Sequence, residues 1–487
     1  MPLHLPRRDF LTASVAASLT PQLSAAPQTT NSRPNVLFIL TDQWRFSAFG
    51  HSTDQVVRTP NIDRLGAEGT ICTRAYACNP VCTPNRSCLL TGRYSHQTGM
   101  IQNNLMLPPS EVCWPQLLAS AGYDTHYIGK WHLDGQAKPG YVPPGWRRRG
   151  FRTFQGFNRG HIYHKPWGFE DDGAELVPKE VAEAPDYYEP TFQTELAIRY
   201  MSQKRDQPFA CCLSLGPPHT PFTPPKKFNL YTREQIQLRP NVPAQHEATA
   251  RRDLAGYYGL CESLDHEVGR LMTFLSESEL AGNTLVIFTS DHGELAGSHG
   301  KYRKGEPEEE SLHVPLIFRL PGRIPAAHET ATLVNSIDVM PTMLSLCGIE
   351  PPKTCSGRDV SRVIAGEQPR QDSAIYCEGK LSGSNDEEDA KPRRTSGAKG
   401  RVVAPESSPS WRTIVTDRWK LTVRHGERNV EHLFDLNEDP FEQHNLVTSD
   451  RHKSTITDLT EQLLAIRDAT GDSWPRTPKS AASMYEG

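Results

Sequence analysis

Short apolar runs that end in polar residues recur along the first three quarters of the chain. The clearest covers residues 34–41 and is apolar almost throughout, as is typical of a strand buried on both faces of a parallel sheet. Further strands are predicted at 123–128, 209–215, 284–289 and 314–320. Helices are predicted at 59–69, 112–121, about 248–280 and 338–347. Strands that alternate with helices predict an α/β fold with a large, doubly wound, mainly parallel sheet.

The last quarter of the chain has a different pattern. Short alternating strands are predicted at 411–415, 419–423 and 432–436, followed by a helix at about 453–470. The preceding stretch, about 379–410, is polar and has little to bury, which predicts a mobile loop. We therefore expect a catalytic domain at 33–375 and a C-terminal subdomain at 376–487, built from a smaller antiparallel sheet and a helix.

Polar residues with catalytic potential directly follow four of the predicted strands. They are Asp42 and Gln43, Lys130 and His132, His219, and Asp291 and His292. Because the carboxyl ends of parallel strands meet at the edge where such sheets bind ligands, we expect these side chains to converge. Lys130 and His132 are two residues apart, so in an extended chain they point to the same side.

Four of these residues suit a divalent metal. Two carboxylates, from Asp42 and Asp291, and an amide oxygen, from Gln43, are hard ligands that Ca²⁺ and Mg²⁺ prefer. The imidazole of His292 shifts the preference toward Mn²⁺ or Zn²⁺. Ca²⁺ is favoured here, with Mg²⁺ and Mn²⁺ as alternatives. Either aspartate alone would fit a simple capping role at a strand end.

The stretch Asn79–Arg93 contains a cysteine with unusual surroundings. Cys82 lies between two prolines, and Pro84 predicts a helix start just after it. Free amides at a helix start favour an anion, and Arg86 follows one turn later with donors suited to an oxyanion. Taken alone, Cys82 could equally be a small buried residue in a loop.

The spacing Cys82-x-Pro84-x-Arg86, followed by Leu-Leu-Thr-Gly-Arg at 89–93, resembles the signature of the type I sulfatases in the alkaline phosphatase superfamily. In that family the cysteine is oxidised to Cα-formylglycine by a maturation enzyme, and the aldehyde hydrate is the nucleophile. Residues 122–132 are similar to the family's second signature, and residues 288–317 to its second metal segment. Three positions depart from the usual pattern: Asn85, Gln43 and His292.

The resemblance implies a role for each candidate residue. Cys82, as formylglycine, would join the four metal ligands, and Arg86 would help to hold the sulfate. Lys130 and His132 would bind the sulfate and the hydrate. His219 would protonate the leaving alcohol, and Lys304 would contact the sulfate and the leaving oxygen. The implied fold is that of alkaline phosphatase.

The irregular stretch 133–190 is the expected wall of the substrate site. It is rich in proline, glycine, aromatic and cationic residues, and it joins two core strands. We expect His161, His164 and Lys165 to bind substrate. We rank them above the run Arg147–Arg149, because a charge cluster of this kind is usually solvated.

Composition and the first residues bear on the setting of the protein. A net charge of −4 over 487 residues gives no reason to expect nucleic-acid binding. Arg7-Arg8, a weak apolar run to Leu23 and small residues at 24–26 predict a twin-arginine export signal peptide at 1–26. Such signals carry folded proteins, so we expect a periplasmic or extracellular protein. No later segment reads as a membrane span, and the eleven cysteines include no Cys-x-x-Cys pair.

These observations predict a sulfatase that hydrolyses sulfate monoesters, on a sulfated carbohydrate, in polysaccharide degradation. Two alternatives stay open. The first is a phosphonate or phosphate monoester hydrolase on the same scaffold. It is raised by Gln43 and His292, since glutamine and histidine at these two positions also occur in sulfatase-like phosphonate monoester hydrolases. The other is a non-catalytic protein that binds sulfated glycans and never converts Cys82.

Overall fold

The computed structural model describes residues 33–52, 56–184, 186–367, 374–379, 410–424 and 429–475. The predicted export signal lies outside these ranges, as does almost all of the predicted loop at 379–410. All eleven cysteines lie within them, all are free, and ten are buried. Within these ranges no helix is both long enough and apolar enough to cross a membrane.

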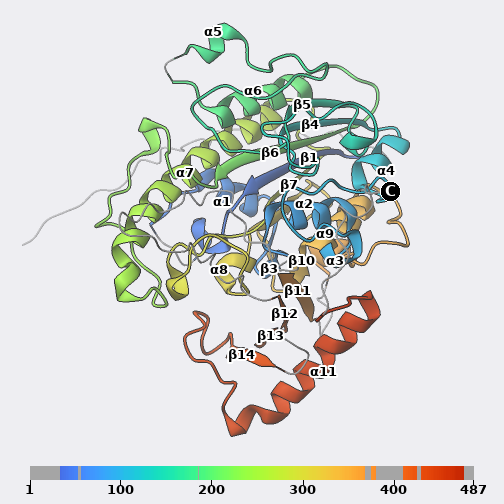
Figure 1. Cartoon of the computed structure of the whole chain (residues 1–487). Coiled ribbons are helices and arrows are strands. Elements are labelled where there is room, and N and C mark those ends of the chain that lie inside the picture. Colours follow the sequence, from blue (N-terminus) through green and yellow to red (C-terminus); the bar gives the residue numbers. More distant parts are fainter. Residues whose placement is uncertain are drawn as a thin grey trace, which may run out of the picture. The chain divides into compact units, whose positions relative to one another are not determined.

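An eight-stranded sheet forms the centre of the fold (Figure 1). Its order is β5-β4-β6-β1-β7-β8-β2-β9, and the five strands from β5 to β7 run parallel. β8 is antiparallel to both of its neighbours. The bounds are β1 Asn35–Asp42, β2 Thr70–Cys72, β4 Asp124–Lys130, β5 Thr153–Phe157, β6 Phe209–Pro218, β7 Thr284–Ser290, β8 Leu316–Arg319 and β9 His328–Thr330. The predicted large, mainly parallel α/β sheet is confirmed.

Helices cover both faces of this sheet, as the continuous apolar run of β1 requires. Alternate residues of β1, such as Phe38 and Ile39, belong to two different hydrophobic cores. One core includes α2 Cys82–Thr91, α4 Trp114–Ser120 and α9 Ser336–Leu346. The other includes α1 Pro60–Ala67, α6 Glu189–Met201 and the long α7 Glu247–Glu277. Burial on both faces explains why β1 carries almost no polar residue before its end.

A separate four-stranded antiparallel sheet follows in the C-terminal part, as predicted. It consists of β11 Ile375–Gly379, β12 Trp411–Val415, β13 Trp419–Arg424 and β14 Val430–Asp435. Leu459 and Leu463 of α11 Lys453–Thr470 share a hydrophobic core with Ile414 and Leu421 of this sheet and with Ile337 of α9. The division into two domains stays a prediction.

Several elements were not predicted, among them a strand and a helix near the substrate wall. The stretch 133–190, expected to be irregular, contains the edge strand β5 and the start of α6. In β5 the apolar alternation is short and is broken by Gln155 and Gly156, which weakens its sequence signal. The short remaining elements are β3 Ala75–Tyr76, β10 Val334–Asn335, α3 Ser95–Thr98, α5 Lys179–Ala182, α8 Glu309–Leu312 and α10 Ser361–Ile364.

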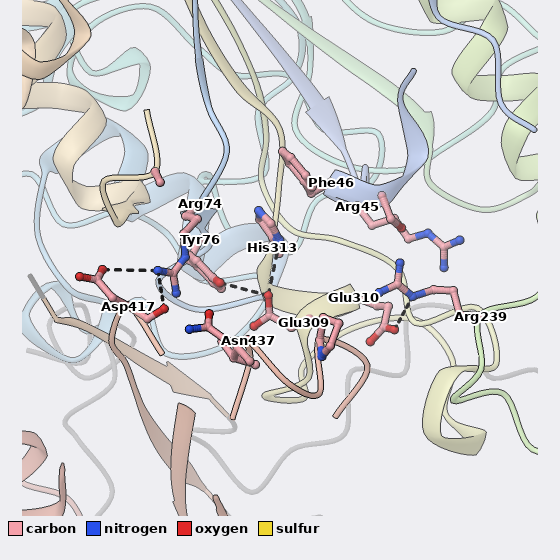
Figure 2. A pocket seen from close by; sticks show the side chains of 14 residues that line it. Arg45, Phe46, Arg74, Tyr76, Arg239, Glu309, Glu310, His313, Asp417 and Asn437 are labelled. Carbon is pink, nitrogen blue, oxygen red and sulfur yellow. Dashed lines mark hydrogen bonds and ion pairs between the residues drawn. The ribbon is translucent and has the colours of Figure 1, made fainter. Parts of the chain in front are cut away.

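A cavity of about 430 Å³ lies where residues 417 and 436–440 meet the loops of the central sheet (Figure 2). Its charged side chains are largely paired with one another. Arg74 lies 3.4 Å from Asp417, and Arg239 lies 2.8 Å from Glu310. A cavity whose charges are already matched favours a structural junction over a site for a charged ligand.

Removing Arg412 should destabilise the protein strongly. Arg412 of β12 and Asp472 after α11 form a fully buried bidentate ion pair, with N–O distances of 2.5 and 2.9 Å. Arg412→Ala leaves a buried carboxylate unpaired, so we expect a loss of about 3–5 kcal/mol of unfolding free energy in urea denaturation. The control, Arg418→Ala, removes a partly exposed partner of Asp435 and should cost less than about 1 kcal/mol. Equal losses would contradict this assignment.

The stability contributed by His96 should depend on pH. Burial lowers the pKa of His96, but Glu378, 2.7 Å away, outweighs it, so the pKa is raised. A raised pKa gives stability that is fully present below the unfolded value of about 6.5 and is lost as pH rises through the folded value. The urea midpoints of wild type and His96→Gln should therefore differ more at pH 5.5 than at pH 9. For the control His266→Gln, at an exposed position, we expect a small difference at both. A pH-independent effect of His96→Gln would refute the link.

Candidate active site

The expected convergence at the sheet edge is present. β1 ends at Asp42, β4 at Lys130, β6 just before His219, and β7 just before Asp291. The helix α2 brings Cys82 to the same edge. It begins at Cys82 itself, two residues earlier than predicted. Apart from Lys304, which is half-buried, all of the predicted catalytic and metal residues are buried.

The Cys82 side chain lies at the centre of this group. Its Sγ is 3.2 Å from His292 Nε2, 3.6 Å from Asp42 Oδ1 and 2.9 Å from Lys304 Nζ. Burial, reinforced by the Asp42 charge, raises the pKa of the Cys82 thiol to about 12. The thiol is therefore protonated at neutral pH and is a weak nucleophile as it stands.

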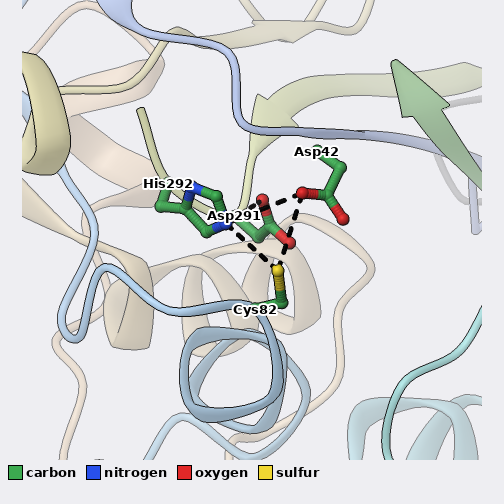
Figure 3. Close-up of side chains that lie close together, drawn as sticks. All are labelled: Asp42, Cys82, Asp291 and His292. Carbon is green, nitrogen blue, oxygen red and sulfur yellow. Dashed lines mark hydrogen bonds and ion pairs between the residues drawn. The ribbon is translucent and has the colours of Figure 1, made fainter. Parts of the chain in front are cut away.

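Four ligand atoms face one another around Cys82 (Figure 3). They are Asp42 Oδ1, Cys82 Sγ, Asp291 Oδ1 and His292 Nε2. The His292 Nδ1–H donates to the Gly293 carbonyl at 2.9 Å, which leaves the Nε2 lone pair directed at the other three. Burial lowers the pKa of His292 to about 4, so the imidazole is neutral. Two carboxylates, a neutral imidazole and residue 82 form a donor set that fits a divalent metal.

Gln43 is held in a suitable orientation beside them. Its backbone has φ of 71°, and its Nε2 donates to Glu294 at 2.5 Å. The amide oxygen therefore points away from Glu294, and it lies 3.4 Å from Lys304 Nζ. Glu294 thereby fixes which end of the amide faces the site.

Arg86 is engaged mainly with protein groups. Its Nε donates to Asp291 Oδ2 at 2.9 Å and its Nη2 to Asp42 Oδ2 at 3.0 Å. Its Nη1 donates to the Lys130 carbonyl and to Ser214 Oγ, each at 2.9 Å. The guanidinium thus fixes both carboxylates so that their Oδ1 atoms face Cys82. Direct contact of Arg86 with sulfate stays a prediction.

Two lysines and two histidines line the other side of Cys82. Lys130 Nζ lies 2.9 Å from Asp42 Oδ2 and 2.8 Å from His161 Nε2. Lys304 Nζ lies 3.1 Å from His219 Nε2, and the rings of His161 and His219 stack at 3.7 Å. Burial, with the charge of Lys304, holds the pKa of His219 well below its usual range. Burial, together with the neighbouring His219 and Lys130, also holds the pKa of His161 well below its usual range.

His132 does not follow the extended-chain prediction. Its φ is 59°, so the chain turns after Lys130 and strand alternation no longer determines its direction. His132 Nε2 contacts Asn104 Oδ1 at 3.1 Å, and its carbonyl accepts a hydrogen bond from Thr83 at 2.8 Å. Asn104 was missed because it lies in a loop without a sequence signature.

The three predicted substrate residues lie in different places. His161 lies inside the buried cluster, against His219 and Lys130, whereas His164 and Lys165 are exposed. His164 Nε2 donates to the Thr223 carbonyl at 2.8 Å. The three roles stay predictions.

The expectation that the run Arg147–Arg149 is solvated is wrong. Arg148 and Arg149 are buried, and they bind Asp171 and the Glu111 carbonyl. Arg147 pairs with Asp134 at 2.6 Å. These arginines satisfy local acceptors of the fold, which a pattern of like charges in the sequence cannot reveal.

Asn85, the departure within the Cys82 motif, also has a structural role. Its Nδ2 donates to the Asp291 carbonyl at 2.5 Å, and its Oδ1 accepts from Ser336 at 2.6 Å. The side chain thus joins α2 to the loop after β7 and to the start of α9. Its place within the motif gave no signal for this bridge.

Comparisons with known proteins agree with the geometry. The family described as Sulfatase matches residues 34–349. The ulvan-active sulfatase of Formosa agariphila is 36% identical over 70% of this chain and 66% of its own length. The endo-4-O-sulfatase of Bacteroides thetaiotaomicron is 28% identical over 91% of this chain and 93% of its own. The solved structure of a sulfatase, yidJ, from Bacteroides fragilis has a TM-score of 0.79 at 26% identity and covers 93% of this chain and 98% of that one. The chain therefore belongs to the sulfatase family, within the alkaline phosphatase superfamily, and is a sulfuric ester hydrolase.

Proposed function

We propose that the protein is an exported, periplasmic or extracellular, sulfatase that hydrolyses sulfate monoesters of a sulfated saccharide, with Cα-formylglycine at position 82 and one divalent metal. The observation that carries the proposal is the position of the Cys82 side chain. It starts a helix, contacts the Asp42 carboxylate, the neutral His292 imidazole and Lys304, and lies in one cluster with Asp291. A reactive group at this point meets both a metal-binding donor set and a cation.

Conversion of Cys82 by a formylglycine-generating enzyme supplies the nucleophile. The intact Cys82-x-Pro84-x-Arg86 motif supports it, and the protonated thiol explains why the unconverted side chain would be a weak nucleophile. The hydrated aldehyde offers one hydroxyl to attack sulfur and a second whose deprotonation releases sulfate.

Asp42, Gln43, Asp291 and His292 would hold the metal together with residue 82. Carboxylate and amide oxygens favour Ca²⁺, with Mg²⁺ or Mn²⁺ as alternatives. A bound cation would neutralise charge on the sulfate oxygens. The orientation of His292 Nε2 and of both Oδ1 atoms supports this ligand set.

The charge of the site suits an anionic ester. Three cations, Arg86, Lys130 and Lys304, face two carboxylates, Asp42 and Asp291. Lys130 and Lys304 approach Cys82 from the side of His161 and His219, and they are the groups we assign to the sulfate oxygens.

His219 is assigned to protonate the leaving oxygen, and His132 to help deprotonate the second hydroxyl. His219 Nδ1 donates to the Thr220 carbonyl at 2.8 Å, so Nε2 is the atom that carries the transferred proton. In the free protein burial, together with the Lys304 charge, lowers the pKa of His219. An anionic ester between these two groups offsets that charge, so substrate binding favours the protonated, acidic form of His219.

A sulfated saccharide is the proposed substrate class. The relatives named above include one whose name refers to ulvan and one named as an endo-4-O-sulfatase. His161, His164 and Lys165 are the proposed substrate-binding residues. Gln43 and His292 keep phosphonate monoester hydrolysis as the second candidate, since both lie at the metal cluster.

Residue 82 should be formylglycine in active protein. Mass spectrometry of the tryptic peptide 75–86 should show loss of sulfur and gain of oxygen, because Cys82 carries the only sulfur that the conversion removes. Cys82→Ala should lower kcat for an aryl sulfate by at least about 10⁴-fold, since no other group at this point can form the sulfated intermediate.

The matched control is Cys355→Ala, which changes a thiol outside the site and should retain activity. Full activity in protein with unmodified Cys82 would refute the mechanism. A higher kcat/KM for aryl phosphonate than for aryl sulfate would favour the second candidate.

Metal removal should abolish activity reversibly. Chelation should leave the apoprotein inactive, and Ca²⁺ should restore it. Asp42→Asn and Asp291→Asn should each lower bound metal well below one ion per chain and activity by at least about 100-fold, because each removes a charged ligand. Asp206→Asn, at an exposed site, is the control and should change neither quantity. Active enzyme without a bound divalent ion would contradict the ligand set.

A further inference from the structure

A second cavity, of about 630 Å³, is lined by His164 of the predicted substrate wall. Its lining includes His164, Tyr187, Tyr188, Lys226 and Lys227, and we call it the tyrosine–lysine pocket. The volume lies within the range of typical ligand sites. It contains none of the residues that surround Cys82, so it is separate from the site described above.

Two chain segments lead from the stacked pair His161 and His219 to this pocket. In one, His161 stacks on His219, and three residues later His164 donates to the Thr223 carbonyl. In the other, His219 is followed by Thr223 and then by Lys226 and Lys227. Tyr163 ties the two together, since its hydroxyl donates to the His219 carbonyl at 2.6 Å. Three residues of chain span at most about 10 Å, so the pocket begins within reach of a short oligosaccharide held at Cys82.

Two tyrosines line the pocket, and the hydroxyl of one of them is buried without a partner. Tyr187 is 8% exposed, and its hydroxyl has no hydrogen-bond partner among the described residues. A buried polar group of this kind is unfavourable unless a ligand or water satisfies it. Tyr188 lies beside it, with its ring centroid 5.5 Å from that of His164. The pocket thus offers two aromatic side chains, Tyr187 and Tyr188, against which a sugar ring can pack.

Two lysines give the pocket a positive charge. Lys226 and Lys227 are exposed, and in the described ranges neither forms an ion pair with the protein. Lys227 Nζ instead lies 4.8 Å from the centroid of the Phe228 ring. Asp186 is the one acidic residue of the described lining. Two unpaired ammonium groups against one carboxylate favour an anionic ligand.

We propose that the tyrosine–lysine pocket binds a second, anionic sugar unit of the chain whose sulfate is hydrolysed at residue 82. This inference rests on the proposed sulfatase function and extends it: the substrate is an oligosaccharide or polysaccharide that carries a further sulfate or carboxylate next to the reacting unit. Tyr187 and Tyr188 pack against that unit, and Lys226 and Lys227 hold its anionic group.

The first test is kinetic. We compare a single-sugar or aryl sulfate with ulvan oligosaccharides of defined length. Lys226→Ala/Lys227→Ala should lower kcat/KM for the oligosaccharide by roughly 10- to 100-fold more than for the aryl sulfate, mainly through KM. Tyr187→Ala, which removes the ring, should show a smaller selective loss of about 5-fold. The matched control Lys204→Ala/Lys353→Ala removes two exposed lysines elsewhere and should leave both substrates unaffected.

The second test measures binding without turnover, in full-length Cys82→Ala protein by calorimetry. Cys82→Ala protein that keeps Lys226 and Lys227 should bind the oligosaccharide about 10-fold or more tightly than Cys82→Ala protein in which both lysines are replaced by alanine. If that gain disappears with the desulfated oligosaccharide, sulfate is the recognised group. If the gain disappears with the carboxyl-reduced oligosaccharide, the carboxylate is the recognised group.

Two results would overturn the inference. The first is an equal loss of kcat/KM on aryl sulfate and on oligosaccharide in the lysine variant. The second is that the native oligosaccharide binds equally tightly with and without Lys226 and Lys227. If converted wild-type protein hydrolyses no sulfate ester at all, the proposed function fails instead. The binding measurement then still decides whether the pocket takes an anionic sugar.

Discussion

The charge balance at the carboxyl edge of the sheet is the constraint on which the site depends. Asp42 and Asp291 are fully buried, and a buried carboxylate is stable only when cations and donors surround it. Burial opposes ionisation of Asp42, yet Lys130, His219 and Arg86 hold its pKa well below the usual range. Arg86 bridges the two carboxylates, and Lys130 contacts one of them. The same contacts that make the cluster tolerable in the interior also direct the remaining oxygens at residue 82.

The fold meets this constraint through close approach of its strand ends. At Gly129, with φ of 99°, a Cβ atom would lie 2.1 Å from the Ser214 carbonyl oxygen, so glycine is required for β4 and β6 to lie together there. That contact brings Lys130 and Ser214 to Arg86. Gly293 has the same role after β7, where a Cβ atom would lie 2.0 Å from the Glu310 carbonyl oxygen. The backbone geometry of two glycines therefore fixes the spacing of several charged groups.

The sequence predicted the central strands, the helices on both faces and the convergence of Asp42, Lys130, His219 and Asp291, because these follow from local apolar runs and from the parallel arrangement of strands. It could not place His161. The loop that carries His161 is positioned by contacts between distant residues, such as Tyr163 with the His219 carbonyl. Burial of Arg148 and the left-handed backbone of His132 depend likewise on partners far away in sequence. The local sequence pattern determines where strands end, whereas the path of a long loop is determined by its contacts with residues that are distant in the sequence.

The burial of free cysteines affects how the chain withstands oxidation before and after folding. As an unfolded polypeptide it would present eleven thiols to any oxidant, with many wrong pairings available. Once folded it buries ten of them, and Cys355 alone is partly accessible. Protection against mispairing is therefore a property of the finished fold and not of a disulfide framework. The folded chain is therefore better protected against oxidising surroundings than the unfolded chain, whichever compartment it occupies.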